Sequence, residues 1–150
     1  MAHRKADVDI DDEDQFYDEA EAAAPVAELE AALAAKTADV RALLSRGNVA
    51  AALQTALNEP VYGGRDVDSI KERTLQLVME ALAATRPADI AGVVAELRPG
   101  QLDVLLKYVY GGMARPDLFN SALLLSWHEK AYEVGGLGAI VRVLTDRRAV

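Results

Sequence analysis

The chain has 150 residues, about the length of a single domain, and 51% of them are hydrophobic, which is enough to build a buried core. It contains no cysteine, which excludes a disulfide framework, a thiolate zinc site and a cysteine nucleophile. The first residues become acidic where a signal peptide has an apolar stretch, and the longest uncharged apolar run, 118–127, is too short to span a bilayer. We therefore expect a soluble intracellular protein.

Residues 1–24 are strongly acidic. They contain nine acidic and two basic side chains and carry −7 of the net charge of −8, whereas residues 25–150 contain 15 acidic and 14 basic side chains. Because like charges repel and bury nothing, we predict that residues 1–24 form a disordered arm. Two interpretations stay open: a solvated tail, or an arm that orders on a partner with Phe16 and Tyr17 as anchors. Neither part has the strongly basic footprint of a nucleic-acid-binding protein.

Beyond the arm the sequence predicts helices, because alanine and leucine dominate and both enter helices at little entropic cost. The Ala-rich residues 25–36 are interpreted as a helical linker. Thr37 is expected to cap a second short helix that stops at Gly47. Asn48 is an N-cap candidate for the next helix, which ends before Pro60.

Glycine and proline mark the turns in the middle of the chain. The turn residues of 58–66 predict a loop, and Asp66 or Asp68 is expected to cap a longer helix that follows it. That helix ends before Pro87, which starts another one. Pro99-Gly100 is predicted to break this helix in turn.

The next two helices carry the clearest apolar patterns. Gly111-Gly112 and Pro116 are predicted to mark the end of the first. It has a one-face stripe at helical spacing: Leu102, Leu105, Leu106, Val109, Tyr110 and Met113. A helix over 119–134 follows. Leu124, Leu125 and Tyr132 make this helix apolar nearly all round, which predicts a position central in the core or a partner that covers it.

Gly135-Gly136 predicts a further break before the last segment, in which Leu137 to Leu144 show helical spacing. The composition of 140–144 also suits a short strand, but we favour a helix because no second strand is available to pair with it. Short connections imply antiparallel neighbours. We therefore predict an all-α fold, a compact bundle of about seven short antiparallel helices, with residues 37–150 as the helical domain.

Candidate catalytic groups are few. The histidines are His3 and His128, and a zinc-protease pattern at His128 would need a second histidine where Tyr132 stands. The alternating aspartates of 7–11 lack the glycine and the final glutamate of a calcium loop, and the glycines of 135–138 lack the spacing of a nucleotide-binding loop. We interpret His128 as a helix residue with one hydrogen bond. The expectation is a protein that is not an enzyme, with no catalytic residue, cofactor or metal, although a pocket with paired carboxylates is left open.

Several blocks of the chain occur in the same order as in a known family: Val8-Asp9, Phe16 and Asp18-Glu19; 46–48 with 51–57; 102–111; 123–131; and 135–150. These blocks resemble the subunit 5 family of the actin-related protein 2/3 complex. Residues 25–36 depart from the family pattern, which commonly has a Gly-rich or acidic linker there. A helix rises only about 1.5 Å per residue, so an Ala-rich helix at this place would shorten the reach of the arm.

The resemblance implies a non-catalytic subunit of a hetero-oligomer in the cytoplasm and the actin cytoskeleton, where the complex starts a new filament as a branch. The helical domain would dock on the β-propeller subunit and subunit 4, and the arm would tether actin-related protein 2. The candidate partner-binding residues of the arm are Val8, Asp9, Phe16, Tyr17, Asp18 and Glu19. The candidates in the helical domain, for partner binding or for the core, are Leu105, Tyr108, Tyr110, Trp127, His128 and Arg142. Without the resemblance, the alternative is a free-standing helical adaptor with an acidic partner-binding arm.

Overall fold

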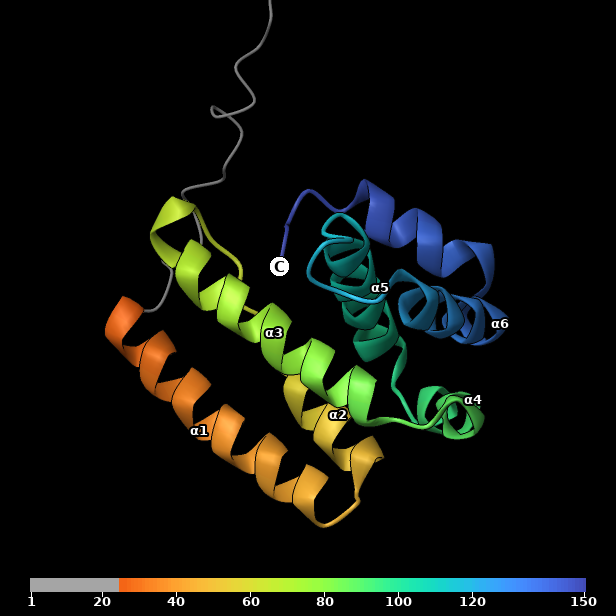
Figure 1. The fold of residues 1–150 in the computed structure, drawn as a ribbon. Helices are drawn as coiled ribbons and strands as arrows, with labels where there is room; N and C mark the ends of the chain where they lie inside the picture. The colour runs from red at the N-terminus through yellow and green to blue at the C-terminus, as the bar shows by residue number, and fades with distance from the viewer. Residues whose placement is uncertain (1–24) are drawn as a thin grey trace, which may run out of the picture.

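The computed structural model describes residues 25–150, and every regular element in this range is helical (Figure 1). This part of the chain has six α-helices: α1 (Val26–Ser45), α2 (Val49–Leu57), α3 (Asp68–Ala84), α4 (Ile90–Ala95), α5 (Pro99–Met113) and α6 (Ser121–Thr145). Two 3₁₀ turns, Arg65–Val67 and Pro87–Asp89, precede α3 and α4. The predicted all-α class is confirmed, and the predicted acidic arm, residues 1–24, lies outside the described residues.

The helices form two groups that share one core. Helices α1, α2 and α3 pack against one another, and α4 and α5 pack against α6 (Figure 1). Contacts of α5 with α2 and α3 join the two groups. The largest fully buried side chains are Trp127 of α6 and Tyr108 of α5. The second group therefore supplies the bulkiest part of the core, and burial of such apolar surface is the main force that stabilises the fold.

Helix α1 is longer than predicted. Thr37 does not cap a second helix, because α1 runs without a break from Val26 to Ser45. The Thr37 hydroxyl donates a hydrogen bond to the Leu33 carbonyl oxygen at 2.7 Å, the usual way in which a threonine is accommodated inside a helix. Leu33 and Val40 are both buried, so the two predicted segments pack onto the core as one helix.

The turn between α1 and α2 follows the predicted signals. Gly47 has a φ of +74°, which glycine adopts at little cost, and it ends the first helix. The Asn48 side chain accepts a hydrogen bond from the Ala51 amide at 3.2 Å, as predicted for an N-cap. The prediction that Asp66 or Asp68 caps α3 is wrong. Val67 occupies the N-cap position without a side-chain hydrogen bond, because the 3₁₀ turn Arg65–Val67 leads directly into the helix.

Helix α5 corrects two further expectations. Pro99 is its first residue rather than only the end of the helix before it, which fits the fixed φ of proline in a first turn. The helix ends at Met113, between the two predicted end marks, so Gly111-Gly112 lie inside it and Pro116 lies beyond it. A Cβ atom at Gly112 would lie 2.9 Å from both Leu124 Cδ1 and Met79 Cε. Glycine at 112 is thus a consequence of close helix packing, not a signal that the helix stops.

Helix α6 is one element with a sharp bend. Asn120 caps it by accepting hydrogen bonds from the amides of Ala122 and Leu123, so Phe119 lies in the turn before the helix rather than within it. Gly136 has φ 62° and ψ −168°, a conformation essentially restricted to glycine. The break predicted at Gly135-Gly136 is therefore present as a kink. The segment after it is helical, as favoured over a strand.

Candidate docking surface on the last helix

Polar side chains in residues 25–150 form no metal site and line an open hollow. Within residues 25–150 no group of three or more His, Asp or Glu side chains is placed to hold a metal ion. No helix in that range is both long enough and apolar enough to cross a bilayer. An open hollow between α2 and α5 is lined by Asn58, Arg98 and Gln101, where the Gln101 amide already donates to Asn58 Oδ1 at 2.9 Å. The more distinctive surface of this chain is apolar.

Large apolar side chains are exposed mainly on one element. Apart from Val26 on α1, the exposed large hydrophobic residues of the described chain lie on α6 or in the turn before it: Leu118, Leu125, Tyr132, Val134, Leu137, Val141 and Leu144. Scattered apolar residues are normal on a protein surface, but several on one helix indicate a surface that another molecule covers.

Three of these residues form a regular pattern after the kink. Leu137, Val141 and Leu144 are spaced i, i+4, i+7, so they lie on one face of the helix, and they are 65%, 49% and 71% exposed. We call these three residues the apolar stripe. Ala139 and Val143 of the same segment are buried on the opposite face. The segment after Gly136 is thus apolar on two faces, and only one of them is covered by the chain itself.

The segment before the kink divides in the same way. Leu124, Trp127 and Ala131 are buried against the core, whereas Leu125 and Tyr132, two helical turns apart, are exposed. The prediction of a helix central in the core is therefore wrong for these last two positions. The alternative, a partner that covers this side of the helix, stays a prediction.

Three of the candidate residues in the helical domain belong to the core. Leu105, Tyr108 and Trp127 are at most 1% exposed. Burial is the main reason why the pKa of the Tyr108 hydroxyl lies well above its ordinary value. The Trp127 Nε1 atom is buried without a hydrogen-bond partner. A partner therefore cannot contact these side chains unless the domain opens.

Tyr110 and His128 form a polar pair between α5 and α6. The Tyr110 hydroxyl lies 2.9 Å from His128 Nε2, and the two ring centroids are 5.5 Å apart. Desolvation raises the pKa of the Tyr110 hydroxyl. Both side chains are partly buried, so the pair ties the two helices together at the edge of the core.

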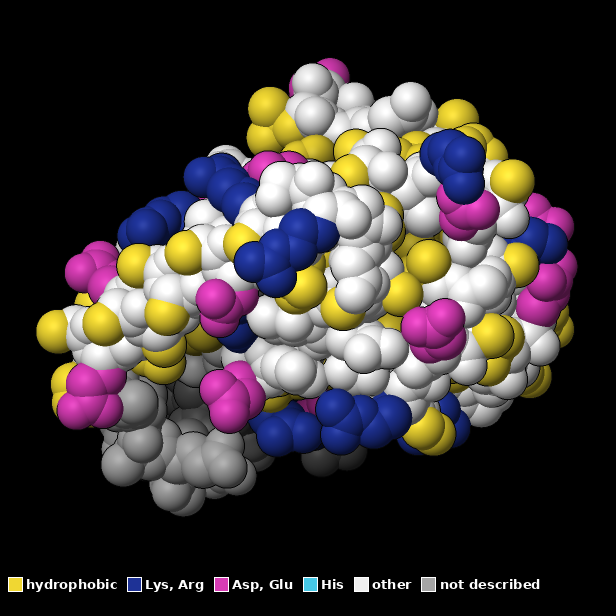
Figure 2. All heavy atoms as spheres, turned by 90° about the horizontal axis from the view of Figure 1, so that it is seen from below, with side chains coloured by type: hydrophobic (Ala, Val, Ile, Leu, Met, Phe, Trp, Pro, Cys, Tyr) yellow, Lys and Arg dark blue, Asp and Glu magenta, His cyan; other side chains and the backbone are white. Residues whose placement is uncertain are grey.

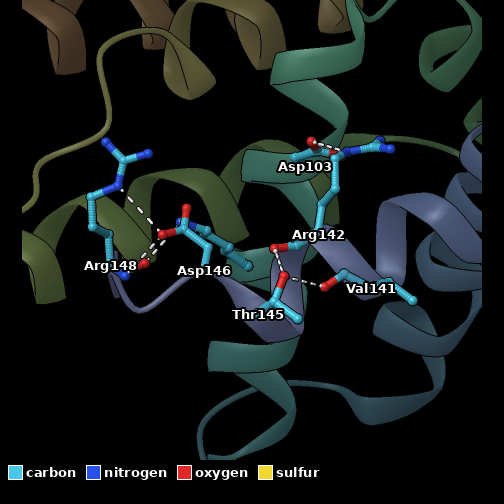
Figure 3. A network of polar contacts seen from close by, with 7 residues as sticks. Asp103, Val141, Arg142, Thr145, Asp146 and Arg148 are labelled. Carbon is cyan, nitrogen blue, oxygen red and sulfur yellow. Dashed lines mark hydrogen bonds and ion pairs between the residues drawn. The ribbon is translucent and has the colours of Figure 1, made fainter.

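Arg142 points away from the apolar stripe and is bound to α5. Its Nε and Nη2 atoms donate to the two carboxylate oxygens of Asp103 at 2.8 and 2.9 Å (Figure 3). This hydrogen bonding raises the pKa of the Arg142 guanidinium. The pair is exposed, so its contribution to stability is small, but a bidentate contact fixes the rotation of the helix about its axis.

The residues after α6 make contacts that the sequence analysis missed. Lys107 of α5 donates to Asp146 Oδ2 at 2.7 Å and to the Arg148 carbonyl oxygen at 2.8 Å. The Lys107 ammonium and the Arg148 guanidinium also lie over the Tyr62 ring, 4.8 and 4.9 Å from its centroid. Partners that are about 40 residues apart leave no periodic signal in a single sequence, so only the structure reveals them.

Side chains of both charges lie on the surface. On the face shown in Figure 2, basic and acidic side chains lie scattered among apolar ones. This agrees with the balance of 14 basic and 15 acidic side chains in residues 25–150. The surface feature that stands out is therefore the apolar side of α6.

Comparison with known proteins gives one consistent result. Residues 2–150 match the family described as ARP2/3 complex 16 kDa subunit (p16-Arc). The chain is 41% identical to actin-related protein 2/3 complex subunit 5-B of Xenopus laevis over 98% of this chain and 93% of the relative. It is 40% identical to the human subunit 5-like protein, over 98% of this chain and 94% of the relative. For subunit 5 of Dictyostelium discoideum the identity is 32%, over 92% of this chain and 98% of the relative. The chain therefore belongs to the p16-Arc family, the 16 kDa subunit of the ARP2/3 complex.

Proposed function

We propose that this chain is a non-catalytic structural subunit of the actin-related protein 2/3 complex in the cytoplasm and supports the nucleation of branched actin filaments. The observation that carries the proposal is an exposed apolar side of α6 in a chain that matches this family over residues 2–150. The relatives are named as subunits of that complex. A subunit of a stable assembly must bury surface against its neighbours, and the core of such an interface is apolar.

The helical domain docks on the β-propeller subunit and on subunit 4, and the apolar stripe is the surface that we assign to this contact. Full burial of a valine or leucine side chain contributes about 1.5–3 kcal/mol. Leu137, Val141 and Leu144 are 65%, 49% and 71% exposed, so about half or more of this free energy is left for a partner. Part of it offsets the entropy lost on association. The exposed side chains of Leu125 and Tyr132, before the kink, offer further apolar surface to a partner.

The arm tethers actin-related protein 2. Six residues of the arm are proposed to make this contact: Val8, Asp9, Phe16, Tyr17, Asp18 and Glu19. Two observations support this: the family match begins at residue 2, and residues 1–24 carry a net charge of −7 together with the aromatic residues Phe16 and Tyr17. An acidic segment with aromatic anchors suits a binding mode in which charge steers the encounter and the aromatic rings are buried.

The docking surface is tested with a double variant, Leu137→Glu and Val141→Glu, in the full chain. The variant should keep the helical circular dichroism spectrum, because both side chains are exposed. It should fail to copurify with the other subunits when the complex is assembled, because two carboxylates would be buried without partners. Val26→Glu on α1 is the matched control, since it changes an exposed valine outside the surface and should assemble normally. Normal assembly of the double variant would contradict the assignment.

The arm is tested by deletion of residues 1–24. The shortened chain should fold and assemble, and the complex should release actin-related protein 2 more readily on dilution. A complex of unchanged stability and full nucleation activity would refute the tether. If instead the full chain migrates alone on size exclusion of a cell lysate and binds a basic protein in a strongly salt-sensitive way, the free-standing adaptor is the correct function.

A further inference from the structure

The chain continues past α6 as a short segment without regular secondary structure. We call residues 146–150 the C-terminal strap. In Figure 1 the strap leaves the end of α6 and ends between α3 and α5, near the loop that precedes α3. Tyr62 of that loop receives the Arg148 guanidinium on its ring face, and Val150 packs partly buried against the core. The strap thus connects the end of the last helix to the other group of helices.

Lys107 is the centre of this connection. Its side chain is only 9% exposed, an unusual position for an ammonium group, and it is satisfied by Asp146 and by the Arg148 carbonyl, both in the strap. Asp146 accepts in addition from the Arg148 amide at 3.0 Å (Figure 3). Loss of the strap would remove both hydrogen-bond acceptors of the Lys107 ammonium, Asp146 Oδ2 and the Arg148 carbonyl oxygen, so the contact consists of more than a surface ion pair.

The apolar stripe lies between the kink at Gly136 and the start of the C-terminal strap. At one end is Gly136, whose φ of 62° creates the kink from which the last part of α6 departs. At the other end, directly after Thr145, the strap begins. Arg142 is bound to Asp103 between them. Ala139 and Val143 of this segment are buried, so the strap adds a second attachment at the far end of a helix that already packs on the core.

We infer that the C-terminal strap, anchored by Lys107, sets the orientation in which α6 presents Leu137, Val141 and Leu144 to a partner protein. Lys107 and Asp146 are positioning residues: neither belongs to the stripe, and both act on it through the end of the helix. The inference rests on the proposed docking function. It adds that the interface is preorganised from within the chain, which lowers the entropy that binding must remove.

The test compares amide hydrogen exchange in three forms of the full chain. One is truncated after Thr145, one carries Lys107→Met, and one carries Lys130→Met as the matched control. Lys130 pairs with Glu133 at 2.7 Å within α6 and does not touch the strap. Truncation should raise exchange in 137–145 by about tenfold, while exchange in 121–134 stays unchanged. Lys107→Met should act in the same direction without leaving a buried charge, and the control should match the wild type.

Assembly measurements then separate the two levels of the inference. The truncated chain should bind the remaining subunits about three- to tenfold more weakly than the full chain, because the stripe is no longer held in place. Unchanged exchange in 137–145 would overturn the strap as a structural device. Raised exchange with unchanged affinity would overturn its role in docking. Failure of the wild-type chain to join the complex would instead refute the proposed function. If truncation unfolds the chain, Lys107→Met decides between these outcomes.

Discussion

Helices α3 and α6 use their apolar residues in opposite ways. Helix α3 has 17 residues, and eight of them are buried, whereas only five of the 25 residues of α6 are buried. The difference does not come from composition, since α6 is the more hydrophobic of the two. Contacts of α3 with α1, α2 and α5 cover it from several sides, whereas α6 contacts α4 and α5 and leaves one side to solvent.

This difference separates residues that hold the fold from residues that are available to a partner. In α3 the buried positions extend around much of the helix, so the chain alone accounts for its hydrophobicity. In α6 the chain accounts for Leu124, Trp127 and Ala131 but not for Leu125 or Tyr132. The unexplained apolar side is the physical basis of the proposed docking, and it can be challenged by single substitutions.

The largest effect is expected from the two faces of α6. Trp127→Ala removes a fully buried ring and should lower the free energy of unfolding by about 3–5 kcal/mol. Leu125→Ala, two residues away on the exposed side, should change it by about 0.5 kcal/mol or less. Urea unfolding followed by far-ultraviolet circular dichroism measures both, since Trp127 is the single tryptophan and fluorescence is lost with it. Similar losses for the two variants would remove the distinction.

A smaller effect is expected where α3 and α6 meet on α5. Gly112→Ala would place a Cβ atom 2.9 Å from Met79 of α3 and from Leu124 of α6, so it should destabilise the domain by about 1–3 kcal/mol. Gly92→Ala on α4 is the matched control. It is exposed with no atom within 4 Å of the new Cβ, and it should stabilise by about 0.5–1 kcal/mol through helix propensity. Thermal unfolding of both variants gives the comparison, and a stabilising Gly112→Ala would show that the three helices are loosely packed there.

The smallest effect concerns the end of α6 at acid pH. Hydrogen bonds from Lys107 and from the Arg148 amide lower the pKa of Asp146 to about 2, from an ordinary value of 3.8. A depressed carboxyl pKa stabilises the fold fully above the ordinary value, and this stabilisation is lost as the pH falls toward 2. Hydrogen exchange in 137–145, corrected for the intrinsic pH dependence, should therefore rise between pH 4 and 2. In Asp146→Asn this rise should be absent, and a rise of equal size in the variant would assign it to other carboxylates.

Local signals were read correctly from the sequence where a single residue decides the backbone. Gly47 and Asn48 mark the turn after α1. The preference of glycine for a positive φ and of asparagine for the N-cap position is local and does not depend on distant parts of the chain. The prediction that Thr37 caps a second helix is wrong. A threonine hydroxyl can cap a helix or donate to the carbonyl oxygen four residues back, and tertiary packing selects between the two. Gly112 was interpreted as a mark of the helix end, whereas it lies inside α5. The side chains that leave no room for a Cβ there, Met79 and Leu124, come from other helices.

The candidate surface was predictable only in part. The all-round apolar character of α6 showed that something must cover it, but adjacent residues such as Leu124 and Leu125 are chemically equal. Which of them faces the core depends on the rotation of the helix, and this is set by packing against α4 and α5, which leaves no signal in a single sequence. The strap was not foreseen, because Lys107 and Asp146 look like ordinary surface charges in the sequence.

The φ and ψ of Gly136 have one more consequence. No neighbouring atom lies within 4 Å of the position that a Cβ would occupy there, so the obstacle to any other amino acid is torsional rather than spatial. A substitution that replaced the kink at Gly136 by regular helix would change the direction of 137–145. The residues after α6 would then lie away from Tyr62. The contact of the strap with Tyr62 therefore depends on a backbone conformation that glycine alone adopts readily.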